Sequence, residues 1–211
     1  LTVMNIKNIA LQQAAPVCVA IGMLFVIYTG GIDLSVGSIM AFSASLTAIL
    51  IVNYGLPLFL ALIFGLASGV VFGMINGILV AYAGMQGFVA TLAVMTIAKG
   101  AAFVLTNGTP IKIPEGSIDV IVNEAYFYPI IIITIVLIVF FVFVQRNTTY
   151  GRLIMAIGSN VTSVDLAGIP TKKFIASAYA LSGLLAALAG IFVASRTSTG
   201  SATIGSGQEL D

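Results

Sequence analysis

The chain has 211 residues, of which 60% are hydrophobic and only 7% are charged, and its formal net charge is +1. Soluble domains carry about 25% charged residues, so the composition excludes an ordinary soluble protein, and the near-neutral charge gives no sign of a nucleic-acid partner. We therefore expect an all-α, polytopic membrane protein that contacts lipid and binds no nucleic acid.

Six apolar runs approach the roughly 20 residues that a helix needs to cross a bilayer. Each is longer than the roughly 10-residue alternating strands of a membrane barrel. In chain order, the predicted spans are 9–29, 36–52, 57–82, 86–106, 128–144 and 174–194. Residues 1–211 would form one transmembrane domain, and the abrupt ends of the chain, Leu1 and GQELD, suggest a fragment of a longer protein.

An acidic residue lies in TGGIDLSVGS, the stretch that separates the first two runs. Gly30 and Gly31 favour the end of the first helix, and Asp33 can cap the second by accepting from the backbone N–H groups that follow it. We interpret this stretch as a helix corner at the cytoplasmic boundary. The alternative is that the second run begins deeper and lines a translocation pathway with Asp33, Ser35 and Ser38.

Glycines recur every four residues in the third run, at Gly65, Gly69, Gly73 and Gly77. They share one helix face and would let a second backbone approach closely, which favours helix packing in lipid. The last run repeats the pattern more loosely, with Gly183, Ala187 and Gly190.

Polar side chains within the other runs are candidates for the pathway. Lys99 lies about 10 Å from the outer end of its run at 1.5 Å per residue, so its ammonium can reach the outer headgroups, and the alternative is a place on the pathway. Thr96 lies on the same helix face. Further polar residues could face a polar cavity or make interhelical hydrogen bonds: Asn76, Gln86 and Thr91.

The two long polar connections differ in charge. Residues 107–127 hold one lysine against three acids, whereas residues 145–173 hold four basic residues against Asp165. By the positive-inside rule, 145–173 is cytoplasmic and 107–127 faces outward. Alternation then puts the shorter connections 30–35 and 83–85 inside, and 53–56 and the tail after 195 outside.

A short helix is predicted within the cytoplasmic connection 145–173. Asn160 is a good N-cap, residues 161–167 can form two turns, Gly168 suits the left-handed position after a helix, and Pro170 prevents continuation. The small residues and Asp165 make this element a poor lipid anchor. We favour a docking surface for a cytoplasmic partner over an interfacial helix.

Three stretches together resemble a known family: YTGGIDLSVGS, QGFVATLAVMTIAKGAAFVLTNGTPI, and GRLIMAIGSNVTSVDLAGIPTKKFIASAYALSGLLAALAG followed by GQELD. They are similar to the permease subunits of bacterial ABC importers for ribose, xylose, galactose, autoinducer-2 and related sugars. The resemblance implies a longer permease of about eight to ten spans in the inner membrane, with one span before Leu1 and others after Asp211.

The resemblance also implies a division of labour. Two permease copies would form the pore, a cytoplasmic ATP-binding subunit would drive it, and a periplasmic binding protein would deliver a sugar. The chain has no G-x-x-x-x-G-K-[ST] phosphate loop, so we expect it to bind no cofactor and to hydrolyse no ATP itself. On the resemblance, the helix that contacts the ATPase carries Gly158, Asn160, Asp165, Leu166 and Gly168.

Other function classes fit less well. A membrane enzyme is disfavoured because the chain has no histidine and no tight carboxylate cluster within a span. A secondary transporter driven by ions is the stronger rival, since Asp33 and the glycine-broken runs resemble discontinuous helices that bind ions. Within the importer class, the alternatives are permeases for nucleosides or branched-chain amino acids.

Overall fold

The structure is a computed structural model that describes residues 2–122 and 129–208. Residue 128, where the fifth predicted span begins, the acid at 124 and the last three residues of GQELD lie outside those ranges. Within them the helices are α1 (Val3–Tyr28), α2 (Val36–Val52), α3 (Leu58–Ala81), α4 (Gly87–Thr106), α5 (Pro129–Asn147), α6 (Thr149–Ser159), α7 (Val161–Leu166) and α8 (Thr171–Thr197). The short elements are β1 (Ile111–Lys112), η1 (Asp119–Ile121) and β2 (Thr199–Gly200).

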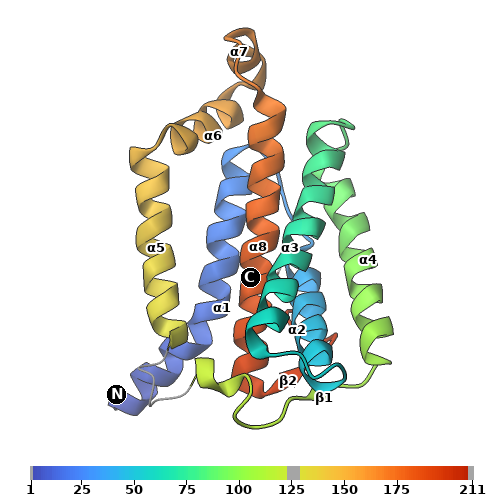
Figure 1. The fold of residues 1–211 in the computed structure, drawn as a ribbon. Helices are drawn as coiled ribbons and strands as arrows, with labels where there is room; N and C mark the ends of the chain where they lie inside the picture. Colours follow the sequence, from blue (N-terminus) through green and yellow to red (C-terminus); the bar gives the residue numbers. More distant parts are fainter. Residues whose placement is uncertain (1, 123–128, 209–211) are drawn as a thin grey trace.

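The long helices form one bundle and run alternately up and down (Figure 1). We call the end with α6 and α7 the α7 end, and the opposite end, with β1 and β2, the β end. Five of the described helices are long and apolar enough to cross a membrane: α1, α3, α4, α5 and α8. This confirms the all-α membrane fold, but the prediction of six full spans is wrong for α2, a shorter apolar helix of 17 residues.

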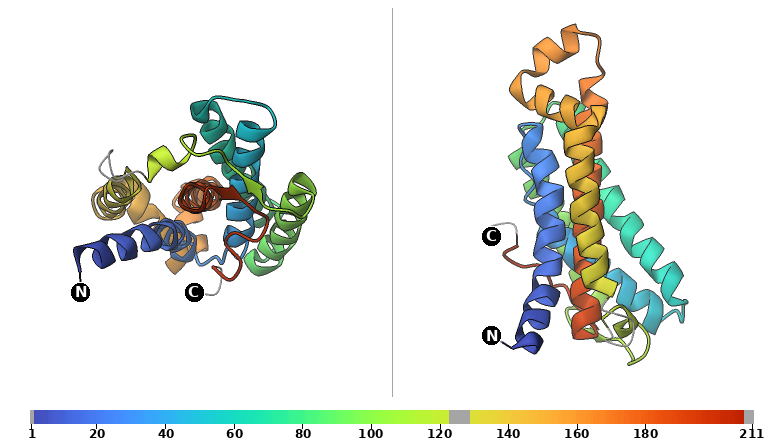
Figure 2. Two further views of the ribbon diagram at one scale, coloured as in Figure 1. Left: turned by 90° about the horizontal axis from the view of Figure 1, so that it is seen from below. Right: turned by 90° about the vertical axis from the view of Figure 1, so that its left-hand side faces the viewer.

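The first helix begins six residues before the predicted start at residue 9. The Thr2 side chain accepts a hydrogen bond from the Asn5 N–H at 3.3 Å, so this threonine caps the helix where hydropathy gave no signal. Pro16 lies inside the helix. A proline in this position removes a backbone hydrogen bond and bends the axis, and Figure 2 shows the first part of α1 inclined away from the bundle.

The central helix is α8, which packs against α1, α2 and α3. Its closest neighbour is the glycine ladder of α3. A Cβ atom added at Gly69 would overlap the Gly183 carbonyl oxygen, one at Gly73 would overlap the Tyr179 carbonyl, and one at Gly77 would lie 2.7 Å from the Ala176 Cα. Gly65, at the other end of the ladder, meets the Thr47 hydroxyl of α2. The ladder therefore holds α3 against α8 with backbone in contact with backbone.

The connection after α4, predicted only as a polar loop, closes the β end of the bundle. β1 pairs with β2 in antiparallel register, and the Ile113 N–H donates to the Ser198 carbonyl at 2.9 Å. Ile113 and Ile118 are fully buried against Ala44, Ala48 and Ala194. The hydropathy pattern did not predict the burial of these two isoleucines, because each is isolated within a polar segment. Their buried packing partners come from α2 and α8.

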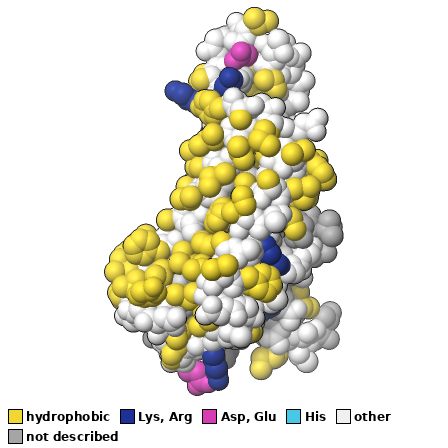
Figure 3. Space-filling view, turned by 90° about the vertical axis from the view of Figure 1, so that its right-hand side faces the viewer, with side chains coloured by type: hydrophobic (Ala, Val, Ile, Leu, Met, Phe, Trp, Pro, Cys, Tyr) yellow, Lys and Arg dark blue, Asp and Glu magenta, His cyan; other side chains and the backbone are white. Residues whose placement is uncertain are grey.

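The outward faces of the bundle are apolar. In α5 only Ile130 and Thr134 are buried, and its other described side chains are at least partly exposed. Figure 3 shows hydrophobic side chains over most of one face, with charged side chains chiefly towards the two ends. Such a surface suits lipid or another membrane-embedded subunit.

Candidate functional site

The chain is not helical between α1 and α2. The Gly30 and Gly31 N–H groups donate to the Ile27 and Val26 carbonyls, and Gly30 has φ +78°, so α1 ends in the left-handed conformation that glycine permits. Residues 31–35 then run into the bundle without regular secondary structure, and α2 begins about half-way down (Figure 1). We call residues 29–35 the break segment.

Asp33 is the buried centre of the break segment, with 1% of its surface exposed. Its Oδ1 accepts from the Ser35 N–H at 2.9 Å and from the Ser35 Oγ at 2.6 Å. Its Oδ2 accepts from the Ser182 Oγ of α8 at 2.8 Å. The Asn76 Nδ2 of α3 donates to the Ser35 Oγ at 2.7 Å. We call Asp33, Ser35, Asn76 and Ser182 the Asp33 network, which joins the break segment to α2, α3 and α8.

The position of Asp33 corrects the predicted corner at the cytoplasmic boundary. Ser182 lies 11 residues beyond Thr171, the first residue of α8, so its contact with Asp33 is about 16 Å along that helix. The predicted cap of Ser35 by Asp33 is present, but inside the bundle. The structure agrees with the deeper start of the second run, which was the stated alternative, while a role in lining a pathway stays a prediction. A helix cap has the same local signature at any depth, and the partner that sets the depth is 149 residues away.

One atom of the network remains unsatisfied. Asn76 is fully buried, and its Oδ1 has no hydrogen-bond partner among the described residues. A buried acceptor without a partner costs about 1–3 kcal/mol. Asn76 therefore keeps one free acceptor within the bundle, next to the break segment.

Tyr179 of α8 is hydrogen-bonded to the middle of the break segment. Its hydroxyl donates to the Ile32 carbonyl at 3.3 Å. Cβ atoms added at Gly31 and Gly87 would lie 2.5 and 2.7 Å from this hydroxyl, so both glycines make room for the phenol. Tyr179 and Ser182 were not among the residues predicted from the sequence, although both are polar residues within an apolar span, the same signal that singled out Asn76 and Lys99.

The α7 end carries a second group of predicted residues. The helix α6 lies across this end of the bundle (Figure 1), and it was missed because residues 149–159 were read as loop. Gly151, Ile154 and Ile157 are its buried residues, and their spacing of three is the helical periodicity that could have found it.

The helix α7 has the capping that its sequence predicts. The Asn160 Oδ1 accepts from the Ser163 N–H at 2.9 Å, and Gly168 has φ +80°. The Asp165 Oδ1 accepts from the Thr171 Oγ1 at 3.1 Å, which holds α7 to the start of α8. None of the six residues of this described helix is buried, and Leu166 is 85% exposed.

The α6 helix also contacts the end of α1. A Cβ atom at Gly158 would overlap the Tyr28 carbonyl and lie 3.4 Å from the Gly30 nitrogen. Ile154 packs with Phe25 in one buried cluster, and the Tyr150 ring stacks on Phe25 with centroids 6.2 Å apart. Gly158 thus lies against the end of α1, although it is exposed, while the other predicted coupling residues lie on or beside α7. The helix α6 therefore connects the end of α1, at Gly158, to the coupling residues on α7.

None of the remaining candidates is hydrogen-bonded to the Asp33 network among the described residues. Ser38 is buried in the first turn of α2. Gln86 and Thr96 are exposed, and the Thr96 hydroxyl donates to the Leu92 carbonyl of its own helix. The Thr91 hydroxyl likewise donates to the Gly87 carbonyl. The structure therefore gives Thr91 and Thr96 local hydrogen bonds within α4.

Lys99 bonds to the part of the chain that follows β2, and both of its predicted roles, at the headgroups and on the pathway, stay predictions. Its Nζ donates to the Ser206 Oγ at 2.6 Å. Ser206 belongs to residues 201–208, which we call the tail segment. This segment turns back from β2, so that a Cβ at Gly205 would lie 2.6 Å from the Gly37 carbonyl of α2. The sequence could not show that the chain after 200 returns to the bundle.

The chain was compared with known proteins. Residues 5–211 match the family described as the branched-chain amino acid transport system / permease component. The chain is 38% identical to the ribose import permease of Haemophilus influenzae over 98% of its length, and 40% identical to that of Bacillus subtilis over 99%. It is 40% identical to the galactofuranose transporter permease of Escherichia coli over 87% of its length.

The chain spans 66% of the length of those two ribose permeases and 54% of the galactofuranose permease. No solved structure matches it. The resemblance inferred from the three sequence stretches is confirmed by these matches. The chain therefore belongs to the family of branched-chain amino acid transport system permease components, as a multi-pass membrane component of transport.

Proposed function

We propose that this chain is the membrane-spanning part of an ATP-driven importer that moves a monosaccharide or related small polar solute across the inner membrane by alternating access. The observation that carries the proposal is the identity of 38–40% with permeases named for ribose and galactofuranose, over nearly the whole chain. The break segment supports it, since non-helical backbone at membrane depth is typical of transport pathways.

The proposal is tested by uptake into proteoliposomes that contain the full-length permease, its ATP-binding subunit and its binding protein. We expect uptake of labelled D-ribose or D-fructose that requires ATP and no ion gradient. Uptake that needs a proton or sodium gradient and does not depend on ATP would contradict the proposed ATP-driven importer and support an ion-driven secondary transporter.

A second candidate is a branched-chain amino acid permease, which the description of the matched family favours. Competition separates the two, because unlabelled sugar should reduce the uptake of labelled sugar while L-leucine should leave it unchanged. Saturable uptake of leucine, with none of the sugars taken up, would establish the second candidate.

The partners follow from the same proposal. A cytoplasmic ATPase would bind α7, a second permease copy would complete the pore, and a periplasmic protein would deliver the sugar at the β end. The support for ATPase docking is geometric: α7 projects from the bundle and presents Leu166 and Val161 to solvent. In this scheme the chain needs no cofactor, since ATP is hydrolysed on the partner.

Force applied to α7 would reach the break segment along a short route. The hydrogen bond between Asp165 and Thr171 would transmit the force to α8. The continuous helix α6 would transmit it to the backbone of Tyr28 and Gly30, which Gly158 contacts. The break segment begins at that point and ends in the Asp33 network. Packed contacts without a cavity transmit displacement well, so α6 and the end of α1 would move as one body.

Substitution of Leu166 with aspartate tests this docking. We expect the Leu166→Asp variant to fold normally, because the side chain is exposed, and to lose at least about tenfold in ATP-driven uptake, since a charge in an apolar cleft costs more than 1.4 kcal/mol. Copurification of the ATPase and uptake are measured together. The matched control is Ser163→Asp, which puts the same charge on the same helix. Equal ATPase recovery and uptake in wild type and Leu166→Asp would refute docking through this residue.

A further inference from the structure

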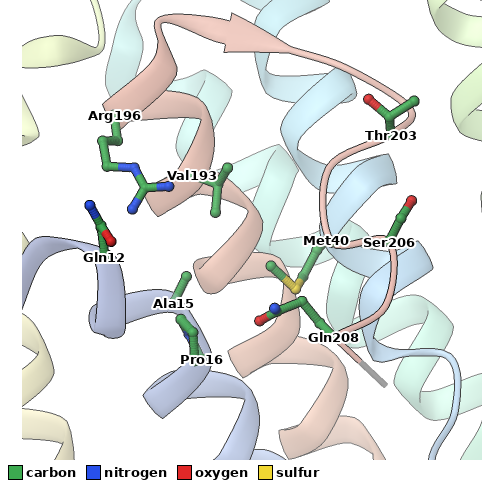
Figure 4. A pocket seen from close by; sticks show the side chains of 10 residues that line it. Gln12, Ala15, Pro16, Met40, Val193, Arg196, Thr203, Ser206 and Gln208 are labelled. Atoms are coloured by element: carbon green, nitrogen blue, oxygen red, sulfur yellow. The ribbon is translucent and has the colours of Figure 1, made fainter. Parts of the chain in front are cut away.

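A polar cavity lies between α1, α2, α8 and the tail segment. Its volume is about 230 Å³, and its walls include Gln12 of α1, Met40 of α2, Arg196 of α8, and Thr203 and Ser206 of the tail segment. Figure 4 shows Gln12 and Arg196 facing each other at one side of the cavity, with Met40 and the tail segment, which carries Thr203, Ser206 and Gln208, at the other. The walls also include Gln208 of the tail segment and the apolar residues Ala15, Pro16 and Val193.

We propose that this cavity is a contact site for a neutral, polyhydroxylated solute on its way through the permease. The inference rests on the proposed function and names the part of the chain that its substrate would touch. A cavity of this volume is smaller than the roughly 300–1,000 Å³ of sites for drug-sized ligands, which suits a small molecule.

The chemistry of the walls favours hydroxyl groups. The amide of Gln12 both donates and accepts, the hydroxyls of Thr203 and Ser206 do the same, and the guanidinium of Arg196 offers five donors. No carboxylate lies among the described lining residues, so a cation has no counter-charge there. Arg196 lies in the last turn of α8, where the helix dipole offsets part of its positive charge, and this weakens the case for an anion.

The tail segment forms a wall that is held on two sides. The Lys99 Nζ donates to the Ser206 Oγ at 2.6 Å, and Gly205 lies against the Gly37 carbonyl with φ +73°. The Ser201 and Thr203 hydroxyls are 2.8 Å apart, and the Thr203 N–H donates to the Ser201 Oγ. The wall is therefore organised before any solute arrives, which reduces the entropy cost of binding.

The position of the cavity suits a pathway. Arg196 lies one residue before the end of α8, at the β end, whereas Met40 lies in the second turn of α2. Gly37, which contacts the tail segment, is two residues after Ser35 of the Asp33 network. The cavity thus lies between the β end and the second turn of α2, and its tail wall contacts α2 close to the Asp33 network.

Cysteine labelling tests whether the cavity is wet and binds sugar. Cys18 is the only cysteine of the 211 residues, so the background for labelling is a full-length transporter in which Cys18 and any cysteine outside residues 1–211 are replaced by alanine. Gln12→Cys is expected to react with a charged, membrane-impermeant methanethiosulfonate. Ile97→Cys is the control, because Ile97 is 62% exposed on the apolar outside of α4 and should stay unreactive in lipid. Saturating transported sugar should slow Gln12→Cys labelling at least about threefold, and L-leucine should not.

Uptake kinetics provide the second measurement. Gln12→Leu should raise the KM for sugar about tenfold, which corresponds to one lost polar contact, while Gln13→Leu should stay within about twofold. Both glutamines are exposed on α1, and Gln13 lies outside this cavity. The inference is overturned if Gln12→Cys does not react, if sugar gives no protection, or if the two leucine variants have the same KM.

Wild-type uptake separates this inference from the proposed function. A wild type that imports leucine and no sugar contradicts the proposed function itself. Protection of Gln12→Cys is then measured with leucine, and protection by the amino acid overturns the assignment of a neutral polyhydroxylated solute. A wild type that imports sugar, with unprotected Gln12→Cys, leaves the proposed function standing and removes only the cavity from it.

Discussion

Replacement of Gly73 with alanine is expected to destabilise the protein by about 3 kcal/mol, because overpacking at a close contact typically costs 1–3 kcal/mol and this one involves backbone atoms that cannot rotate away. The new methyl group would overlap the Tyr179 carbonyl oxygen and lie 2.9 Å from the Ala180 Cα. The measurement is the midpoint of thermal unfolding of the purified full-length permease in detergent.

The chain offers a matched control for this substitution. Gly100 lies within α4, and a Cβ atom there would have no described atom within 4 Å apart from its own helix neighbourhood. Gly100→Ala should be neutral or stabilising by up to about 1 kcal/mol, since alanine favours the helix over glycine. Equal midpoints for the two alanine variants would show that α3 and α8 are not in the close contact described.

Replacement of Asp33 with alanine is expected to cost about 2–4 kcal/mol and to remove most of the uptake. It deprives the Ser35 N–H, the Ser35 hydroxyl and the Ser182 hydroxyl of their common acceptor, and each buried group left unpaired costs about 1–3 kcal/mol, less where a hydroxyl can rotate to another acceptor. Thermal unfolding and sugar uptake are both measured.

Two further variants show whether the effect of Asp33→Ala comes from the lost hydrogen bonds. Asp33→Asn keeps an oxygen towards Ser35 and can donate to the Ser182 hydroxyl, so its stability should stay within about 1 kcal/mol of wild type. Thr91→Val is the control, because that hydroxyl bonds only to carbonyl oxygens of its own helix. If Asp33→Ala were as stable as Thr91→Val, the Asp33 network would not hold the break segment. A stable Asp33→Asn variant without uptake would give the carboxyl group itself a role in transport.

The break segment combines two properties that a moving part of a transporter requires. It is joined at one end to α6 through Gly158, and at the other to α3 and α8 through hydrogen bonds that can exchange. Hydrogen bonds to hydroxyl groups tolerate reorientation, whereas the glycine ladder of α3 and α8 tolerates little separation. We therefore expect the break segment to shift against a fixed α3–α8 pair during transport.

The local features of the chain were accessible from its sequence. Apolar runs predicted α2 at its observed bounds and α3 and α4 within one residue at each end. Asn160, Gly168 and Pro170 predicted the helix α7, because caps and helix stops act over three or four residues. The same local rule predicted that Asp33 would cap Ser35. The order of the motifs also predicted the family.

The position of a residue relative to the rest of the bundle could not be predicted from the sequence. The depth of Asp33 is set by Ser182, the orientation of Lys99 by Ser206, and the burial of Ile113 by α2 and α8. Each depends on a partner far along the chain, and hydropathy and capping carry no information about such partners. Which segments are helical and apolar, and where each can end, follows from residues that are neighbours along the chain. The depth at which the break segment enters the bundle, and the place where the tail segment closes a cavity, follow from contacts between segments that are distant in sequence, so they become visible only in the folded protein.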